Sequence, residues 1–331
     1  MCPEIFGEWL RRQGHRVIRT ASSYWYDAGP RVYQAFPFDW LITPSEDELN
    51  GLLVGNAAVC LRYSAPLEYD LGRLSYHTVC SDPDYDVVAL PKQSRTNVRS
   101  ALKRCTVTRV PFERLADDGW ALQQDTLNRQ GRNYVTRRQW EERCKAATDL
   151  PGFEAWAALV EGTLAATATV FQLGNCCSIL YQQSRTDLLR TGANLALGFA
   201  LTKELIGRAG VNCVFYGLHS LDGPPTVDWF KYRLGYRLRR VRQRVAFHPL
   251  VAPWVNRLFH ALLREATRLR PQSGTLAKAE GLVSFFLEGM LPLERQTVPE
   301  ALRLAPQASG QSGQAAGESA LLPGIPRISS A

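Results

Sequence analysis

A glycine at the start of a predicted helix is the first feature of this sequence with an evident chemical use. The loop that precedes the helix consists of Arg190, Thr191, Gly192, Ala193 and Asn194. A helix that opens at a glycine loop presents free backbone N–H groups and the positive end of its dipole. These residues therefore predict a site for an anion such as a pyrophosphate. A simple turn into a helix has the same sequence pattern.

Two arginines upstream could hold a second anionic group. Residues 91–105 read PKQSRTNVRSALKRC, begin with proline, offer Ser94 as an N-cap and predict a basic helix. Arg95 and Arg99 are one turn apart on a single face, so together they could bind a phosphate or a carboxylate. A solvated basic helix is the alternative interpretation.

The loop LHSLDGPP carries two titratable side chains, His219 and Asp222. The pKa of a histidine suits it to accept a proton from an ammonium group, so this loop could supply a general base. A single loop histidine is also a common surface feature, and that interpretation stays open.

The predicted elements over residues 106–248 must position these side chains. Their order is β-α-α-β-β-β-α-β-α-β, with turns at Glu161-Gly162 and Gly174-Asn175. The predicted strands are 106–110, 153–160, 163–173, 176–182, 211–216 and 237–247, and the predicted helices are 115–129, 136–147, 192–210 and 226–234. Connection order strongly limits the topologies that are available.

This order resembles the GNAT acyltransferase fold, and within it the Fem-type peptidyltransferases and their FemAB-like relatives. The resemblance implies an α/β (α+β) class, with a mixed central sheet, splayed central strands and flanking helices. It implies a smaller, degenerate GNAT-like lobe over 1–104, an acyltransferase domain over 105–250 and C-terminal helices over 251–303. FemAB-like proteins carry a run similar to 95–103 near the substrate cleft, so we expect Arg95 and Arg99 to bind substrate. We also expect Asp222, in the loop LHSLDGPP, to bind substrate.

The segment FKYRLG at 230–235 is a more specific part of the resemblance. GNAT helices often have tyrosine as the second residue here, as general acid, whereas FemAB-like proteins have lysine. Lys231 is thereby implied to contact an anionic acceptor group or the oxyanion, with a surface lysine as the alternative. Tyr181 and Tyr216 would end the splayed strands, where a hydroxyl could donate to the acyl carbonyl, although core tyrosines are commoner. With His219, these residues are the expected catalytic set.

The expected function is N-acyl transfer from acyl-coenzyme A, a cosubstrate rather than a resident cofactor, to an amine of a cell-envelope or small-molecule acceptor. Of the GNAT pyrophosphate motif Q/R-x-x-G-x-G/A, only Gly192 matches here, with Leu189 and Asn194 at divergent positions. Fem-type enzymes use aminoacyl-tRNA and likewise lack the motif, so a transferase acting on a peptidoglycan precursor is the second hypothesis. The absence of a heptad-rich insertion argues against tRNA. A non-catalytic ligand-binding protein is the third hypothesis.

Composition is compatible with these hypotheses. The net charge of +8 and the pI near 9.2 suit an anionic partner or an arginine-rich surface, and no DNA partner is expected. The 8 cysteines are scattered without metal-binding spacing, so we expect no metal site and a reducing, cytoplasmic location. No secretory signal or run of 18 apolar residues is visible.

The C-terminal region predicts two docked pieces and a tail. Residues 251–268 predict an amphipathic helix, for which packing against the body of the protein is the default and peripheral membrane contact the alternative. The run LVSFFLEGML could dock in the same way. Residues 304–331 lack periodicity and predict a disordered tail.

Overall fold

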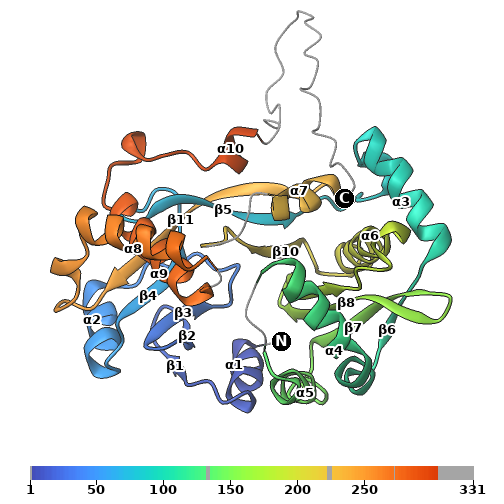
Figure 1. Cartoon of the computed structure of the whole chain (residues 1–331), viewed down its shortest axis with the longest axis horizontal. Coiled ribbons are helices and arrows are strands. Elements are labelled where there is room, and N and C mark those ends of the chain that lie inside the picture. The colour runs from blue at the N-terminus through green and yellow to red at the C-terminus, as the bar shows by residue number, and fades with distance from the viewer. Residues whose placement is uncertain (1, 132–134, 222–225, 272, 305–331) are drawn as a thin grey trace, which may run out of the picture.

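The computed structural model describes residues 2–131, 135–221, 226–271 and 273–304, which form one mixed sheet flanked by helices (Figure 1). Within these residues the strand order is β1-β2-β3-β4-β11-β5-β10-β9-β8-β7-β6. The strands are β1 Val17–Arg19, β2 Tyr24–Gly29, β3 Val32–Phe36, β4 Cys60–Ala65, β5 Arg73–Cys80, β6 Thr106–Val110, β7 Phe153–Val160, β8 Thr163–Leu173, β9 Cys176–Ser184, β10 Cys213–Leu218 and β11 Arg237–Phe247. The α-helices are α1 Pro3–Arg12, α2 Glu46–Gly55, α3 Lys92–Arg104, α4 Phe112–Arg129, α5 Arg137–Lys145, α6 Ala193–Ile206, α7 Thr226–Arg233, α8 Arg257–Leu269, α9 Gly274–Gly289 and α10 Glu300–Leu304. The predicted α/β class is confirmed.

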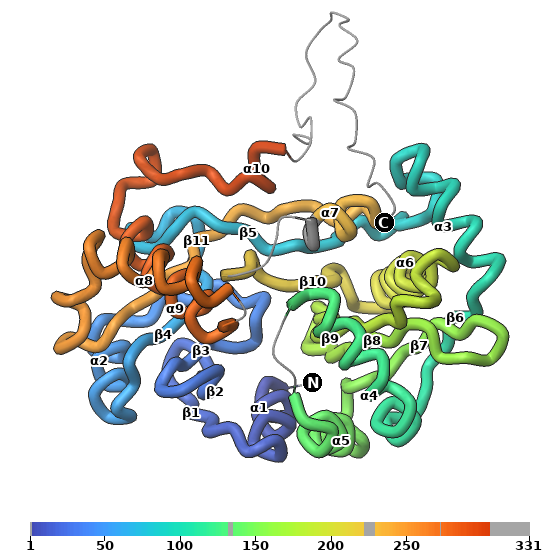
Figure 2. Tube along the Cα trace, viewed as in Figure 1, coloured from blue at the N-terminus to red at the C-terminus, as the bar shows by residue number. Residues whose placement is uncertain are grey.

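Each half of the sheet contains a parallel strand pair joined by a helix. β3 and β4 are parallel and connected through α2, and β9 and β10 are parallel and connected through α6. The two halves exchange their central strands. β11, from the C-terminal half, pairs with β4, and β5, from the N-terminal half, pairs with β10. β5 and β11 also pair with each other and run side by side through the middle of the molecule (Figure 2). The predicted lobes therefore share one continuous sheet, and their boundary near residue 104 stays a prediction.

The element order predicted for residues 106–248 is confirmed, because the structure reads β6-α4-α5-β7-β8-β9-α6-β10-α7-β11. The apolar run YDVVAL at 85–90 is typical of a strand, but that interpretation is wrong, since the segment holds a short 3₁₀ turn, Val87–Ala89. β5 was not predicted. Its polar Ser75, His77 and Thr78 are all buried, so the strand lacks the alternation that marks a half-exposed strand.

Two helix boundaries differ from the prediction for local reasons. α3 begins at Lys92 behind Pro91, so Ser94 lies inside the helix and is not its N-cap. α6 ends at Ile206 with Gly207 as C-cap, before the predicted end at Gly210. By contrast, Thr136, where the predicted helix 136–147 opens, is the N-cap of α5 and forms a complete capping box.

The half of the sheet that carries β6–β10 is covered on both faces. α3 and α6 pack on one face, where Trp156 and Ala158 of β7 point. α1, α4 and α5 cover the other face, where Ala155 and Ala157 point. The alternation along β7 shows that the two apolar clusters lie on opposite sides of the same strands.

Two helices that follow β11, α8 and α9, differ in how they pack. α9 packs on β11 and β5 and buries Leu282, Val283 and Phe285, as predicted for LVSFFLEGML. α8 packs on α9 without fully burying any side chain within its own bounds, and Leu258 and Leu262 are exposed. Val255, just before the helix, is buried, so the segment packs against the body as expected only in part. Pro253 lies in a short 3₁₀ turn, and the helix starts only after Asn256. The predicted tail falls outside the described residues from 305 onward.

Candidate functional site

The parallel pair β9 and β10 separates after three paired residues. Pairing joins Cys176, Cys177 and Ser178 to β10 and goes no further. β10 bulges between Phe215 and Leu218, where it follows β5 instead. The carboxyl ends of the two strands therefore diverge, as predicted. Such ends are where open α/β sheets bind ligands.

Lys231 of α7 lies at this divergence. Its side chain is 8% exposed, and Nζ lies 5.3 Å from the centroid of the Tyr216 ring. Nζ is also 3.7 Å from the place that a Cβ on Gly217 would occupy. Because Lys231 is buried against β10, the alternative of a surface lysine is wrong. The contact of Lys231 with an anionic acceptor group or the oxyanion stays a prediction.

The end of α7 explains why Lys231 points inward. Gly235 has φ +80°, its N–H donates to Tyr232 O at 2.9 Å, and the N–H of Tyr236 donates to Lys231 O at 3.2 Å. These two bonds form a Schellman motif, which ends the helix at a left-handed glycine. Leu234 is fully buried and meets α6 at Gly198. The C-terminal turn of α7 is thus fixed on both sides of Lys231.

Tyr216 holds its ring toward Lys231 and its hydroxyl toward β9. The hydroxyl donates to Gln182 Oε1, which bridges the diverging strands. Burial raises the pKa of Tyr216, so the phenol stays protonated at neutral pH. The hydroxyl is therefore engaged with Gln182 and the ring with the lysine. A direct contact of this hydroxyl with substrate stays a prediction.

Tyr181 lies on the opposite face of the sheet from Tyr216. The pairing of β8 with β9 shifts between Thr169 and Val170, which leaves Leu180 unpaired and reverses the alternation of β9 beyond it. Tyr181 packs in the cluster of α1, α4 and α5, with Arg143 Cζ 4.7 Å from its ring centroid. The two tyrosines predicted to end the splayed strands therefore do not face each other.

His219 follows β10 and is held by β5 and α9. Its Nδ1 lies 3.1 Å from Ser75 Oγ, its ring stacks on Tyr76 with centroids 4.5 Å apart, and Phe285 lies 5.4 Å away. The general-base role stays a prediction. Asp222, predicted beside it, falls outside the described residues.

The sequence interpretation missed a polar network that connects the end of β9 to the start of α6, next to the divergence of β9 and β10. Gln182 Nε2 donates to Asn194 Oδ1 at 3.1 Å, and Asn194 Nδ2 donates to Ser184 Oγ at 2.8 Å. The network therefore runs from Tyr216 through Gln182 to the first turn of α6. The polar run Gln182, Gln183 and Ser184, which ends an otherwise apolar strand, is the signal that could have revealed it.

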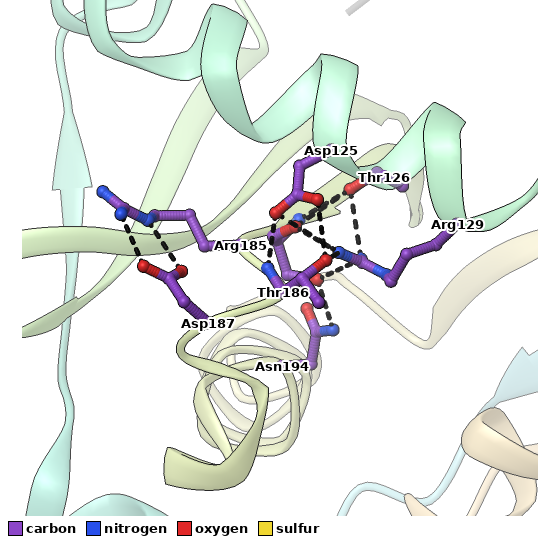
Figure 3. Close-up of polar contacts among 8 residues, drawn as sticks. Asp125, Thr126, Arg129, Arg185, Thr186, Asp187 and Asn194 are labelled. Carbon is purple, nitrogen blue, oxygen red and sulfur yellow. Dashed lines mark hydrogen bonds and ion pairs between the residues drawn. The ribbon is translucent and has the colours of Figure 1, made fainter. Parts of the chain in front are cut away.

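The same network continues to α4 (Figure 3). Arg129 donates to Ser184 O at 2.9 Å and to Ser184 Oγ at 2.8 Å, and Ser184 N donates to Thr126 Oγ1 at 2.9 Å. Asp125 accepts from the N and Oγ1 of Thr186 at 2.5 and 2.7 Å. Burial opposes ionisation of Asp125, but the bonds from Thr186 and the charge of Arg129 outweigh it and lower its pKa. This network fixes the end of β9 and the loop before α6.

The backbone N–H groups of the predicted anion loop donate hydrogen bonds within the loop itself. Thr191 N donates to Leu188 O at 3.1 Å, and Gly192 N donates to Leu189 O at 3.1 Å. Ala193 N donates to Thr191 Oγ1 at 3.3 Å. A pyrophosphate held at a helix start needs such N–H groups for itself. As folded, these three amides do not offer the cradle that coenzyme A would require, and coenzyme A use stays a prediction.

The predicted basic helix lies directly over this loop. A Cβ on Gly192, whose φ is +82°, would come within 2.7 Å of Ala101 Cβ on α3. Arg104 Nη1 donates to Arg190 O at 3.3 Å. Sequence reasoning placed the helix and the loop in separate predicted sites, and the structure brings them together.

The two arginines proposed for substrate differ in burial. Arg95 is partly buried and Arg99 is exposed, on the N-terminal two turns of α3. Their contact with a substrate stays a prediction. Within the described part of the chain, no cluster of three or more His, Cys, Asp or Glu side chains could hold a metal ion.

The close approach of α3 to the loop leads to a stability prediction. Gly192→Ala should lower the free energy of unfolding by about 2 kcal/mol, because a left-handed alanine is strained and its Cβ also meets Ala101. Gly210→Ala is the matched control, since Gly210 has φ +79° with nothing within 4 Å of its Cβ position. Urea unfolding should show a smaller loss for Gly192→Ala in an Ala101→Gly background. Equal losses in both backgrounds would mean that α3 does not cover this loop.

Comparison with known proteins extends the description of the fold. No family model matches the chain, and no curated protein matches it. Among solved structures, FemX is similar over 75% of this chain and 92% of its own, at 12% identity and a TM-score of 0.53. L-PGS from Bacillus licheniformis matches over 75% of this chain and 92% of its own, at 11% identity and a TM-score of 0.48. A tandem GNAT protein from the clavulanic acid biosynthesis pathway matches over 70% of this chain and 82% of its own, at 12% identity and a TM-score of 0.40.

At such identities the likeness concerns the fold alone, and the FemX match carries it. That match extends over most of both chains. The chain therefore has a fold similar to that of FemX, with the element order that the resemblance to the GNAT fold predicted for residues 106–248.

Proposed function

We propose that the protein is an N-acyltransferase that forms an amide bond where β9 and β10 diverge. The observation that carries the proposal is the buried Lys231, which places a positive charge at the carboxyl ends of these strands. Acyl transfer to an amine requires an activated donor, an oriented amine and stabilisation of one oxyanion. A fixed cation at a strand divergence meets the last of these requirements.

In the proposed reaction, the acceptor amine attacks the carbonyl carbon of an ester or thioester donor. A C–N bond forms, and the carbonyl π electrons move to oxygen, which receives a hydrogen bond from Lys231 Nζ. The C=O bond then re-forms as the C–O or C–S bond breaks. The amine nitrogen loses one proton and the leaving group gains one, with His219 as the proposed general base. Burial of Lys231 strengthens its interaction with the oxyanion, because the local dielectric constant is low.

Tyr216 and Gln182 act as positioning residues in this proposal. The ring of Tyr216 supports the ammonium by a cation–π contact, and its hydroxyl is fixed by Gln182. Gln182 is in turn bonded to Asn194 at the start of α6. The lysine therefore rests on a preorganised surface, which is what oxyanion stabilisation demands.

The engaged amides of the loop favour a second, narrower version of the function. An aminoacyl ester carries no pyrophosphate next to its acyl group, so it makes no demand on the amides of Thr191, Gly192 and Ala193. This observation favours a Fem-type reaction, in which an aminoacyl-tRNA donates to the amine of a peptidoglycan precursor. Acyl-coenzyme A, the donor expected from the resemblance, would need this loop to rearrange.

We expect saturating acyl-coenzyme A to leave the melting temperature unchanged. A ligand at 100 times its Kd would add about 2.7 kcal/mol of stability, which corresponds to a rise of several degrees. A panel of acetyl- and longer acyl-coenzyme A species in a thermal-shift experiment tests this expectation. A rise that disappears in Arg190→Ala would instead establish coenzyme A binding at the loop.

The proposed function is tested by following the bond that is made. Purified protein is incubated with an amine-containing extract of its host and either ¹⁴C-aminoacyl-tRNA or ¹⁴C-acetyl-coenzyme A. Esters and thioesters are cleaved by hydroxylamine, whereas amides resist it. Hydroxylamine-stable label is expected with aminoacyl-tRNA. Its absence with both donors would contradict acyl transfer.

A further inference from the structure

Exposed apolar side chains gather in one short segment of the described chain. Within residues 250–269 the large apolar side chains that face solvent are Leu250, Trp254, Leu258, Phe259, Leu262 and Leu269. Trp254 is 76% exposed and Leu269 is 83% exposed. Single exposed apolar residues are ordinary, but a contiguous group on one element marks an interaction surface.

α8 separates three kinds of side chain around its axis. At 3.6 residues per turn, Leu258, Leu262 and Leu269 project within about 40° of one another. Its inner face meets α9, where His260 Nε2 lies 2.6 Å from Glu280 Oε1. α8 lies at the outer edge of the molecule, beyond α9 (Figure 1). The leucine stripe therefore faces outward on a helix that is held in place from behind.

The charge beside the stripe is positive. Arg257, Arg264 and Arg268 project within about 40° of one another and roughly a third of a turn from the leucines. All three are exposed, and Arg270 follows at the helix end. Glu265, the acidic residue of this helix, is paired with Arg268 at 2.5 Å. An apolar stripe flanked by arginines is complementary to a bilayer with anionic headgroups.

We propose that α8 and the turn before it dock the protein on an anionic membrane surface. The leucines and Trp254 enter the boundary between headgroups and acyl chains, and the arginines contact lipid phosphates beside them. No helix among the described residues is long and apolar enough to span a membrane, so the contact is peripheral. The inference stands on the α8 surface and does not rest on the proposed acyl transfer.

Vesicle flotation with the full chain tests the docking. We expect binding to vesicles with 30% phosphatidylglycerol in phosphatidylcholine, and much weaker binding to phosphatidylcholine alone. Leu258→Glu/Leu262→Glu should reduce binding at least tenfold. Arg264→Gln/Arg268→Gln should reduce it roughly fivefold per arginine, as expected from the electrostatic contribution of each charge.

The matched control changes exposed apolar residues elsewhere. Val88 is 63% exposed and Leu102 of α3 is 37% exposed, and α3 lies on the opposite side of the molecule from α8 (Figure 1), so Val88→Glu/Leu102→Glu adds the same charges away from α8 and should bind like the wild type. Vesicles should shift the tryptophan fluorescence of the wild type to shorter wavelength. Trp254→Phe should lack the part of this shift that comes from Trp254. Circular dichroism and thermal melting confirm that each variant is folded.

Three results would overturn the proposal. The first is vesicle binding that is unchanged by Leu258→Glu/Leu262→Glu. The second is a dimer in light scattering that this double variant dissociates, with no vesicle binding by the wild type, which would assign the stripe to a second copy of the chain. The third is binding that appears only after deletion of residues 305–331, which would make that segment the natural occupant.

Discussion

Lys231→Met should lower the rate of amide formation by roughly 100- to 1,000-fold while the protein remains folded, which is the usual cost of losing one oxyanion contact. Methionine keeps most of the side-chain length and volume, whereas alanine would leave a cavity at a position that is only 8% exposed. The loss should appear in kcat, because the contact forms only in the transition state. Initial rates of hydroxylamine-stable product formation provide the measurement.

Two further variants sharpen this test. Lys145→Met removes an exposed lysine from the end of α5 and should leave the rate unchanged. Lys231→Arg should not restore the rate, because a planar guanidinium cannot replace a compact ammonium in the same space. A rate within a factor of three of wild type in Lys231→Met would remove this lysine from the mechanism.

Acid should destabilise the protein through His77, which is fully buried on β5. Burial lowers the pKa of His77 to about 3, and the charges of Arg239 and Arg62 act in the same direction. Its Nδ1 lies 3.0 Å from Arg239 Nη2 and its Nε2 lies 2.8 Å from Ser64 Oγ, which fixes a neutral ring with the proton on Nε2. In the unfolded chain the pKa returns to 6.5.

The sign of the effect follows from these two values. Below pH 6.5 the unfolded state binds a proton that the folded state refuses, so the free energy of unfolding falls as the pH decreases toward 3. The slope from this residue is about 1.4 kcal/mol per pH unit, and the total over the interval between the two pKa values is on the order of 5 kcal/mol. Urea unfolding between pH 7 and pH 4 should show a shallower pH dependence for His77→Gln than for the wild type. Parallel curves for the two proteins would show that His77 does not carry the effect.

Local pattern determined which elements sequence reasoning could find. β7 and β8 were predicted to the residue, because short turns join them and apolar residues mark each strand clearly. β5 was missed because its polar residues Ser75, His77 and Thr78 are buried inside the sheet, a position that depends on the long-range pairing with β10 and β11. Non-local pairing of this kind leaves no periodic signal in the sequence.

In the candidate site, too, local sequence pattern could be interpreted whereas tertiary placement could not. Lys231 was found through a local motif, and its inward position follows from the glycine that ends α7. The face on which Tyr181 lies depends on a bulge at Leu180, which alternation alone cannot reveal. The contact between Ala101 and Gly192 joins segments 91 residues apart and depends on tertiary packing. Residue types were therefore predictable, whereas their relative placement was not.

A crystal structure with a stable aminoacyl-adenosine amide, which mimics the 3′ end of aminoacyl-tRNA, tests the central claim most directly. We predict that the aminoacyl carbonyl binds between the carboxyl ends of β9 and β10, with its oxygen about 2.7–3.1 Å from Lys231 Nζ. The ring of Tyr216 should remain beside Nζ, and Gln182 should remain bonded to Asn194. An aminoacyl group bound elsewhere, with Lys231 more than about 5 Å from any ligand atom and no hydrogen bond between them, would contradict the assignment of this divergence as the site of acyl transfer.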